Sequence, residues 1–330
     1  MKAIAVGILA SFFFAFTFVL NRAMDLEGGS WIWSASLRYY FMVPMLLLIV
    51  MYRGNLKQLF QYMKNNPKDW LVWSIVGFGL FYAPLSFAGA FGPGWLVAST
   101  WQITIVAGIL LTPFFAVDPL HKKLPMKELV MSGIILCGVI LMQVEHASSL
   151  GIRETVLCVV PVLIAAFAYP LGNRKMMQVC KGELDVFQRV LGMTLASLPF
   201  WFLLSGYEVS TGGLPSSSQV FQCFIVAVSS GLIATVLFFF ATDLVKDDPQ
   251  KLATVEATQS GEVLFALVGE LILLSAPIPS SLSWIGMSLV IIGMILHSYV
   301  AVVVKKEEKN NCVMRLVLFI KELIFFRRKG

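Results

Sequence analysis

Apolar stretches, each close to the length of a membrane span, alternate with short polar segments along almost the whole chain. A transmembrane α-helix needs about 20 predominantly apolar residues to cross the hydrocarbon core of a bilayer. The first stretch resembles a signal peptide, but it lacks a small-x-small cleavage site and has the length of a full span. The pattern therefore predicts an all-α polytopic membrane protein with ten transmembrane helices, at residues 3–21, 31–52, 70–90, 94–117, 128–144, 154–172, 185–205, 219–243, 251–274 and 283–304.

The composition argues against several other classes of protein. Of the 330 residues, 58% are hydrophobic and 13% are charged, whereas soluble domains contain about 25% charged residues. The five cysteines show neither CxxC spacing nor a His/Cys ligand pattern, which disfavours a disulfide framework or a zinc site. We also find no glycine-rich phosphate loop, catalytic-triad spacing or metal motif. We therefore predict no catalytic residues, no metal and no cofactor.

Lysine and arginine residues are concentrated on one side of the predicted spans. Of the 25 in the chain, only Arg22 and Arg153 fall in segments on the other side, and Arg38 and Arg189 fall within spans. Because cytoplasmic loops are enriched in basic residues, both termini are predicted to be cytoplasmic, which requires an even number of helices. This pattern predicts a multi-pass protein of the inner or plasma membrane. It argues against nucleic-acid binding, because the net charge of +6 is spread along one membrane face.

The last segment, residues 305–330, is too short and too charged to form an eleventh span. Its end, NNCVMRLVLFIKELIFFRRKG, places most of its charged side chains on one side of a helix. We predict a basic amphipathic helix on the anionic inner leaflet, with a disordered basic tail as the alternative.

Short matches between the two halves indicate an internal repeat, predicted to comprise residues 1–147 and 148–304. The matches align four pairs, in order and about 150 residues apart: Asn21 with Asn173, Arg38 with Arg189, Gln102 with Gln259, and Gly138 with Gly293. Each predicted repeat has five helices, an odd number, so the second would enter the membrane from the opposite side. Inverted repeats place a binding site at their interface near the bilayer midplane.

This arrangement resembles the drug/metabolite transporter superfamily, and within it the ten-helix, EamA-like group of multidrug-resistance efflux transporters. The resemblance covers residues 3–304 and includes ALVGELILL…WIGMSLVIIGMIL (266–296), which is similar to the family's Gly-Glu near the outer end of helix nine and its glycine-rich tenth helix. The sequence departs from that pattern in a long linker from Glu270 to Trp284 and in the first-half segment TPFFAV, which has no matching acid. The resemblance implies export of small organic molecules driven by an ion gradient.

The predicted ninth span contains three acids, Glu256, Glu262 and Glu270. A carboxylate at the bilayer centre is costly unless it is paired, protonated or hydrated. A desolvated carboxylate holds a proton more readily, so it can exchange that proton for a substrate. Glu262, near the middle of the span, is our first candidate for coupling or substrate binding, and Glu256 is the second. The alternatives are a hydrogen-bonded structural glutamate for Glu262 and an ion pair with Arg189 for Glu256; Glu270 is expected to order the outer end of the helix, with coupling as the alternative.

Arg38 and Arg189 are the basic residues within predicted spans. Arginine stays charged in proteins, so each needs an acid, backbone carbonyls, water or an anionic ligand. They could provide counter-charges to the acids of the ninth span. They could also recognise a carboxylate or phosphate, which would make the protein a permease for amino acids or anionic metabolites.

Amide and aromatic side chains recur at equivalent or nearby positions of the two predicted repeats: Gln102, Gln259, Trp101, Tyr169, Asn21 and Asn173. They are candidates to line a hydrated cavity, in which Trp and Tyr faces would attract organic cations. The alternatives are hydrogen bonds between helices and an aromatic belt at the membrane boundary. Glycines within the third span, including Gly77 and Gly79, are expected to permit close approach of helices.

The sequence therefore predicts a secondary transporter that exports small organic molecules in exchange for protons, or another ion, by alternating access. Its partners would be the substrate, the coupling ion and the lipid bilayer. One chain already contains both halves, so a monomer could function, with a homodimer as an alternative. Two other classes were considered: a membrane-embedded enzyme, for which no motif is present, and a non-transporting receptor or scaffold, which the internal repeat disfavours.

Overall fold

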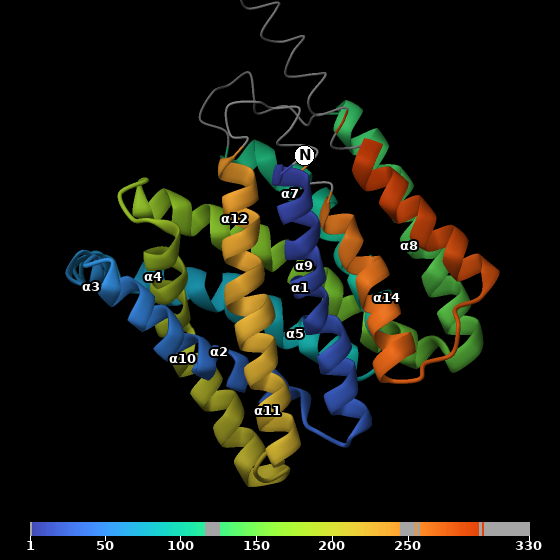
Figure 1. Ribbon diagram of the computed structural model, residues 1–330, viewed down its shortest axis with the longest axis horizontal. Coiled ribbons are helices and arrows are strands. Elements are labelled where there is room, and N and C mark those ends of the chain that lie inside the picture. Colours follow the sequence, from blue (N-terminus) through green and yellow to red (C-terminus); the bar gives the residue numbers. More distant parts are fainter. Residues whose placement is uncertain (1, 116–125, 245–254, 256–257, 297–298, 300–330) are drawn as a thin grey trace, which may run out of the picture.

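The structure, a computed structural model, describes residues 2–115, 126–244, 255, 258–296 and 299. Every regular element in this part of the chain is a helix (Figure 1). Seven of these helices are long and apolar enough to cross a membrane. The prediction of a polytopic helical membrane protein is therefore confirmed, whereas the ten-helix count and the orientation of the termini stay predictions. The segment 305–330 lies outside the described residues.

The first half of the chain contains α1 (Lys2–Leu26), α2 (Trp31–Tyr52), α3 (Leu56–Asn65), α4 (Pro67–Ser74), the π-helical η1 (Ile75–Gly79), α5 (Leu80–Gly89), α6 (Gly94–Trp101) and α7 (Ile103–Phe115). Local sequence explains several of these boundaries. Gly28 adopts φ +78° in the turn after α1, a conformation that glycine adopts without steric cost. The Ser30 hydroxyl accepts a hydrogen bond from the Ile32 amide at 3.2 Å and so caps α2. Pro67 occupies the first position of α4, where its missing N–H costs nothing.

Helix α3 lies in a segment that the hydrophobic pattern predicted only as a polar loop. Leu59 is its buried residue, whereas Lys57 and Lys64 are exposed. A helix with one narrow apolar side and charged remaining faces is typical of the membrane boundary. In Figure 1, α3 lies at the edge of the molecule, beyond the ends of the long helices.

The second half contains α8 (Met126–Leu150), α9 (Ile152–Cys180), α10 (Val186–Thr211), α11 (Ser217–Val226), the π-helical η3 (Ala227–Ala234), α12 (Thr235–Asp243), the 3₁₀ turn η4 (Thr258–Ser260), α14 (Gly261–Leu273) and an apolar helix at Ser281–Leu296. Helix α8 continues past residue 147, the predicted end of the first repeat, and the chain turns at Gly151 with φ +106°. Helix α10 begins with a capping box, because Asp185 Oδ1 accepts the Gln188 amide at 2.9 Å.

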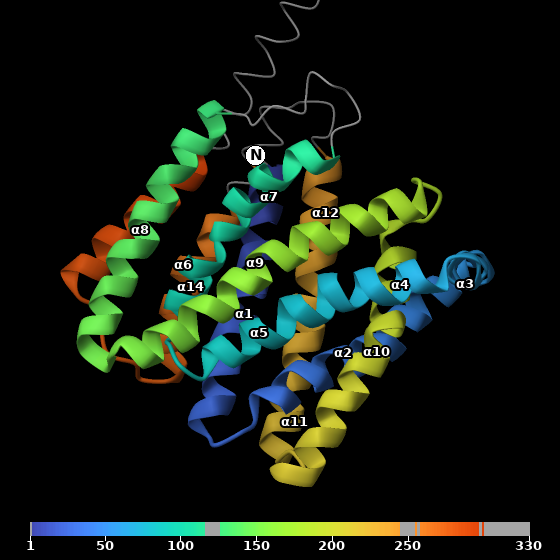
Figure 2. The same cartoon turned by 180° about the vertical axis from the view of Figure 1, so that it is seen from behind.

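Helix α1 occupies the centre of the molecule and packs against α6, α12, η3 and α14. Helix α2 packs along α10, and α5 packs along α9 (Figure 2). In each of these two pairs, one helix belongs to each predicted repeat. The main helix contacts therefore run between the predicted repeats as well as within them.

Small residues allow the closest helix crossings. A Cβ atom added to Gly172 of α9 would lie 2.3 Å from the Gly77 Cα, so no side chain fits between η1 and α9. The expectation that Gly77 permits close helix approach is confirmed. A Cβ on Gly138 of α8 would likewise lie 2.6 Å from the carbonyl oxygen of Gly286. Glycines at such crossings let helix backbones approach within van der Waals contact.

Candidate functional site

Two glutamines that the predicted repeats align lie at helix boundaries. Gln102 separates α6 from α7, and Gln259 lies in the 3₁₀ turn η4 that precedes α14. The side-chain amide of Gln102 donates to the Ala98 carbonyl at 3.1 Å. The buried Nε2 atom of Gln259 has no hydrogen-bond partner among the described residues. Because α6 packs against α14, these two boundaries belong to neighbouring helices, and helix ends within a span provide binding sites near the midplane in transporters.

Glu262 lies in the first turn of α14, directly after the 3₁₀ turn η4. It is 6% exposed, and none of the hydrogen bonds and ion pairs formed by the described residues reaches its carboxylate. The positive end of the helix dipole favours a negative charge at this position. A buried carboxylate without a fixed cation is nevertheless expensive. The environment therefore suits a group that carries either a proton or a cationic ligand.

Glu270 lies further along α14, towards the end of the helix, and has a different environment. Its Oε1 accepts the Gly94 amide at 2.6 Å and its Oε2 accepts the Trp95 amide at 3.4 Å. These are the first two residues of α6, so the carboxylate satisfies amides that have no partner within that helix. This geometry favours the structural role considered for Glu270, because its oxygens already hold α6 against α14.

An aromatic cluster lies at the meeting point of α5, α6 and α9. The Phe81 ring centroid is 5.1 Å from that of Trp101 and 4.7 Å from that of Tyr169, and the last two are 5.6 Å apart. Tyr169 is 39% exposed, yet it lies within electrostatic reach of the buried Glu262. An accessible aromatic face beside a buried acid is a favourable environment for an organic cation.

Arg38 on α2 is buried without an acidic partner among the described residues. Its Nη1 donates to the Thr17 hydroxyl at 3.3 Å, and its guanidinium carbon lies 4.1 Å from the centroid of the Tyr82 ring. Its Nε atom is buried and makes no hydrogen bond with any residue that the structure describes. The described ion pairs are Arg22–Asp25 and Arg53–Asp185. The expected pairing of Arg38 with an acid of the ninth span is therefore not present in this part of the structure.

A polar network surrounds Arg38 and was largely missed by the sequence analysis. Thr17 donates to Ser230 of η3 at 2.6 Å, and Asn21 lies 3.4 Å from both the Tyr82 and the Ser86 hydroxyl. Asn21 was predicted to be a candidate, but the three hydroxyl residues that it and Thr17 contact were not. Serine, threonine and tyrosine are common in membrane helices, so residue type alone could not identify these three residues as part of a site.

The remaining predicted residues, Arg189, Asn173 and Glu256, differ in what the structure shows of them. Arg189 lies in the first turn of α10, is half-buried, and lies within electrostatic reach of Tyr169. Asn173 donates to the Tyr169 carbonyl of its own helix at 3.0 Å, so it does not reproduce the interhelical contacts of Asn21. Glu256, and with it the predicted Arg189–Glu256 pair, lies outside the described residues.

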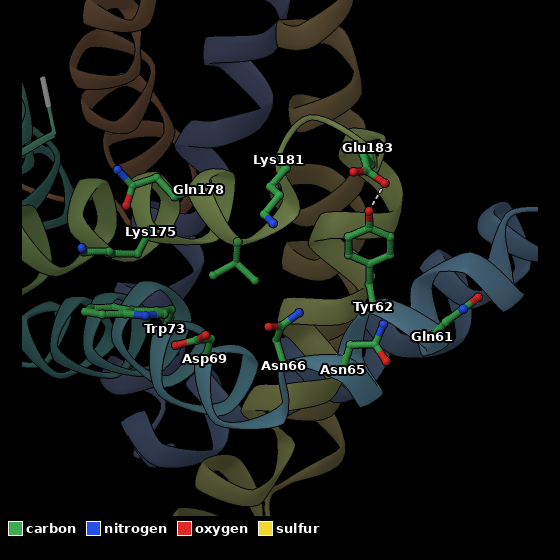
Figure 3. Close-up of a pocket in the computed structure, with 11 residues that line it drawn as sticks. Gln61, Tyr62, Asn65, Asn66, Asp69, Trp73, Lys175, Gln178, Lys181 and Glu183 are labelled. Carbon is green, nitrogen blue, oxygen red and sulfur yellow. Dashed lines mark hydrogen bonds between the residues drawn. The ribbon is translucent and has the colours of Figure 1, made fainter. Parts of the chain in front are cut away.

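A separate pocket of about 780 Å³ opens near the end of α9 (Figure 3). It is lined by residues of α3, α4 and the end of α9. None of the residues predicted from the sequence lines it. This pocket is therefore distinct from the cluster around Tyr169.

Comparison with known proteins identifies a matching family, two related sequences and a solved structure with the same fold. The sequence matches the family described as EmrE, "Putative multidrug resistance efflux transporter", over residues 1–303. It is 59% identical over 317 residues to "Uncharacterized protein YjlA" of Bacillus subtilis (strain 168), which spans 94% of this chain and 98% of that protein. It is 51% identical over 267 residues to "Uncharacterized 42.1 kDa protein in intracellular alkaline protease 3'region" of Shouchella clausii, over 79% of this chain and 70% of that protein. A crystal structure with 12% sequence identity has the same fold, with a TM-score of 0.61 over 91% of this chain and 97% of the other.

Proposed function

Because the chain belongs to the multidrug resistance efflux transporter family of the drug/metabolite transporter superfamily, we propose that it exports small organic cations in exchange for protons. The observation that carries this proposal is the buried carboxylate of Glu262, which has no hydrogen-bond or ion-pair partner among the described residues and lies within electrostatic reach of the partly exposed Tyr169. In the outward-releasing step, a proton binds Glu262 and displaces the cation. In the loading step, the cation displaces the proton, so one site serves both ions.

The aromatic cluster supplies the second part of the proposed site. Trp101 and Phe81 hold Tyr169 through ring contacts at 5.6 and 4.7 Å, so an accessible aromatic face is fixed relative to α14. Aromatic faces attract delocalised organic cations with little dependence on ligand shape. This combination would select for positive charge and apolar surface, which are properties of a chemically broad class of substrates.

The helix irregularities support alternating access by two inverted repeats. The π-helical segments η1 and η3 begin at Ile75 and Ala227, about 150 residues apart, as in the predicted repeat. The helix boundary at Gln102 and the 3₁₀ turn at Gln259 form a second matched pair. Discontinuous or π-helical turns leave backbone groups that can change partners as one repeat moves against the other.

The test is proton release when tetraphenylphosphonium is added to the solubilised protein in weak buffer. We expect about one proton per bound cation from the wild type and none from Glu262→Gln, because the amide cannot exchange a proton. Glu270→Gln is the matched control: it removes another buried acid from the same helix and should still release protons. Equal release from wild type and Glu262→Gln would show that the coupling acid is elsewhere.

A second function, a permease for amino acids or anionic metabolites, is favoured by the buried Arg38. In the described part of the chain its Nε has no hydrogen-bond partner, and Tyr82 rather than an acid covers its guanidinium. In this case organic cations would release no protons, and carboxylates would bind. Binding of the carboxylate should then weaken in Arg38→Lys, which keeps the charge but loses the planar fork.

A further inference from the structure

The pocket at the end of α9 is polar and lies where membrane spans end. Figure 3 shows Lys181 extending into it from the end of α9, with Asp69 and Asn66 on the opposite side from the start of α4. The remaining lining residues include amides from α3 and α9 and the Trp73 ring of α4. Loops rich in lysine and the amphipathic α3 mark this face as a membrane boundary.

Two acids and two lysines line the pocket, but they are not equally available to bind a ligand. The Tyr62 hydroxyl donates to Glu183, and the Lys175 ammonium lies over the Trp73 ring, 5.5 Å from its centroid. By contrast, the side chains of Lys181 and Asp69 form no hydrogen bond or ion pair with the described residues. The pocket therefore presents one available cation and one available anion from its two sides, which matches a ligand that carries both charges.

Apolar side chains also lie on the helices that line the pocket. Val179 of α9 is one of the lining residues, and Val72 of α4 and Met177 of α9 are 50% and 55% exposed. Helices α4 and α9 pack against one another and belong to segments long and apolar enough to cross a membrane, Pro67–Gly89 and Ile152–Cys180, so the acyl chains of a lipid bound in the pocket would extend along these spans. A ligand with a zwitterionic head and apolar chains would occupy both regions, whereas a soluble ion would use only the first.

We propose that this pocket binds the phosphoethanolamine headgroup of a membrane phospholipid. The phosphate lies at Lys181, and the primary ammonium donates hydrogen bonds to Asp69. Neighbouring amides such as Asn66 and Gln178 complete the phosphate and ester contacts. Choline would bind less well because a quaternary ammonium has no N–H to donate, and a glycerol headgroup would leave Asp69 without a cation. This inference concerns a separate site and does not depend on Glu262.

Native mass spectrometry of the full-length protein in detergent would test the proposal. Dioleoyl-phosphatidylethanolamine, -choline and -glycerol would be titrated against wild type, Asp69→Asn, Lys181→Gln and Lys64→Gln. We expect wild type to bind the ethanolamine lipid about fivefold more tightly than the choline lipid. Asp69→Asn should abolish that preference and leave choline-lipid binding unchanged, whereas Lys181→Gln should weaken all three lipids. Lys64→Gln removes an exposed lysine of α3 that does not line the pocket, so it should bind like wild type.

Several results would overturn the assignment. Equal binding of ethanolamine and choline lipids to wild type would exclude recognition of the ammonium, as would a preference that survives in Asp69→Asn. Tightest binding of the glycerol lipid would identify a site for anionic lipids instead. Binding of soluble O-phosphoethanolamine as tight as that of the lipid would show that the acyl chains contribute nothing and that the soluble ester is the ligand. All three substituted side chains are exposed, and unchanged gel-filtration elution would confirm that the variants remain folded.

Discussion

Glu262, Glu270 and Arg38 are buried to similar extents, but the structure accommodates their charges in different ways. Glu270 accepts two backbone amides of α6. Arg38 places its guanidinium over an aromatic ring and reaches one hydroxyl. Glu262 has neither type of partner among the described residues. An unsatisfied buried charge is costly. A mobile ion would therefore stabilise the carboxylate of Glu262 more than it would stabilise the charges of Glu270 or Arg38, which already have partners.

At this scale we predict that Glu270→Ala lowers the free energy of unfolding by about 1–3 kcal/mol, because two buried amides of α6 lose their acceptor. Glu270→Gln should lose less, since its carbonyl oxygen can still accept one of them. Glu27→Ala is the control: Glu27 is exposed and accepts hydrogen bonds from Ser218 and Gln222, so we expect a change within about 0.5 kcal/mol. Thermal unfolding in detergent measures all three; equal losses for Glu270→Ala and Glu27→Ala would refute a capping role.

At the scale of helices, close contact between backbones decides which elements can be neighbours. At the crossing of η1 with α9, a Cβ on Gly172 would lie 2.3 Å from the Gly77 Cα, whereas a Cβ on Gly77 would lie 3.3 Å from the Gly172 Cα. The same crossing lies beside the aromatic cluster, because Phe81 and Tyr169 extend from α5 and α9 just beyond it. The position of the cluster therefore depends on two glycines that take no part in binding.

We predict that Gly172→Ala destabilises the protein by about 1–3 kcal/mol, because the new methyl group would overlap the backbone of η1. Gly206→Ala provides a matched control in the interior of α10, where a Cβ would meet nothing within 4 Å. Its helix propensity should stabilise the protein by up to about 1 kcal/mol. Denaturation midpoints in detergent distinguish the two; a neutral Gly172→Ala would contradict the close contact.

At the scale of the whole molecule, polar contacts join the predicted repeats at both ends of the helices. Arg53 Nε lies 3.2 Å from Asp185 Oδ2 at one end. Ser218 donates to Glu27 at 2.8 Å at the other. Alternating access would require these contacts to break in turn. Both are exposed and individually weak, so neither would hold one state permanently.

The orientation of the whole molecule gives a further prediction. The distribution of lysine and arginine places the segment containing Cys312 in the cytoplasm. In a variant whose other cysteines are replaced by serine, a membrane-impermeant maleimide should label Cys312 only after the cells are permeabilised. Ser280→Cys in a cysteine-free chain lies in a predicted external segment and is exposed, so it should be labelled in intact cells. The reverse labelling pattern would mean that the orientation is wrong.

The sequence predicted the class of fold and several members of the candidate site. Span length and apolar content are properties of contiguous residues, so they could be read without knowing any contact. Likewise, an acid such as Glu262 within an apolar stretch stands out because the bilayer penalises it wherever it lies. The amphipathic α3 was missed because the search for apolar runs of span length passes over a ten-residue helix with one buried leucine.

The sequence by itself therefore determined a helical membrane protein with basic residues concentrated on one predicted side and a small set of costly polar residues in its spans. Only the tertiary structure decided which of these residues have partners. Glu270 accepts a hydrogen bond from the Gly94 amide 176 positions away in sequence, Arg38 lies over the Tyr82 ring, and Glu262 has no such partner among the residues that the structure describes. Partners of this kind depend on how distant helices pack, and that packing depends on small residues and helix interruptions whose effects cannot be read from any single segment.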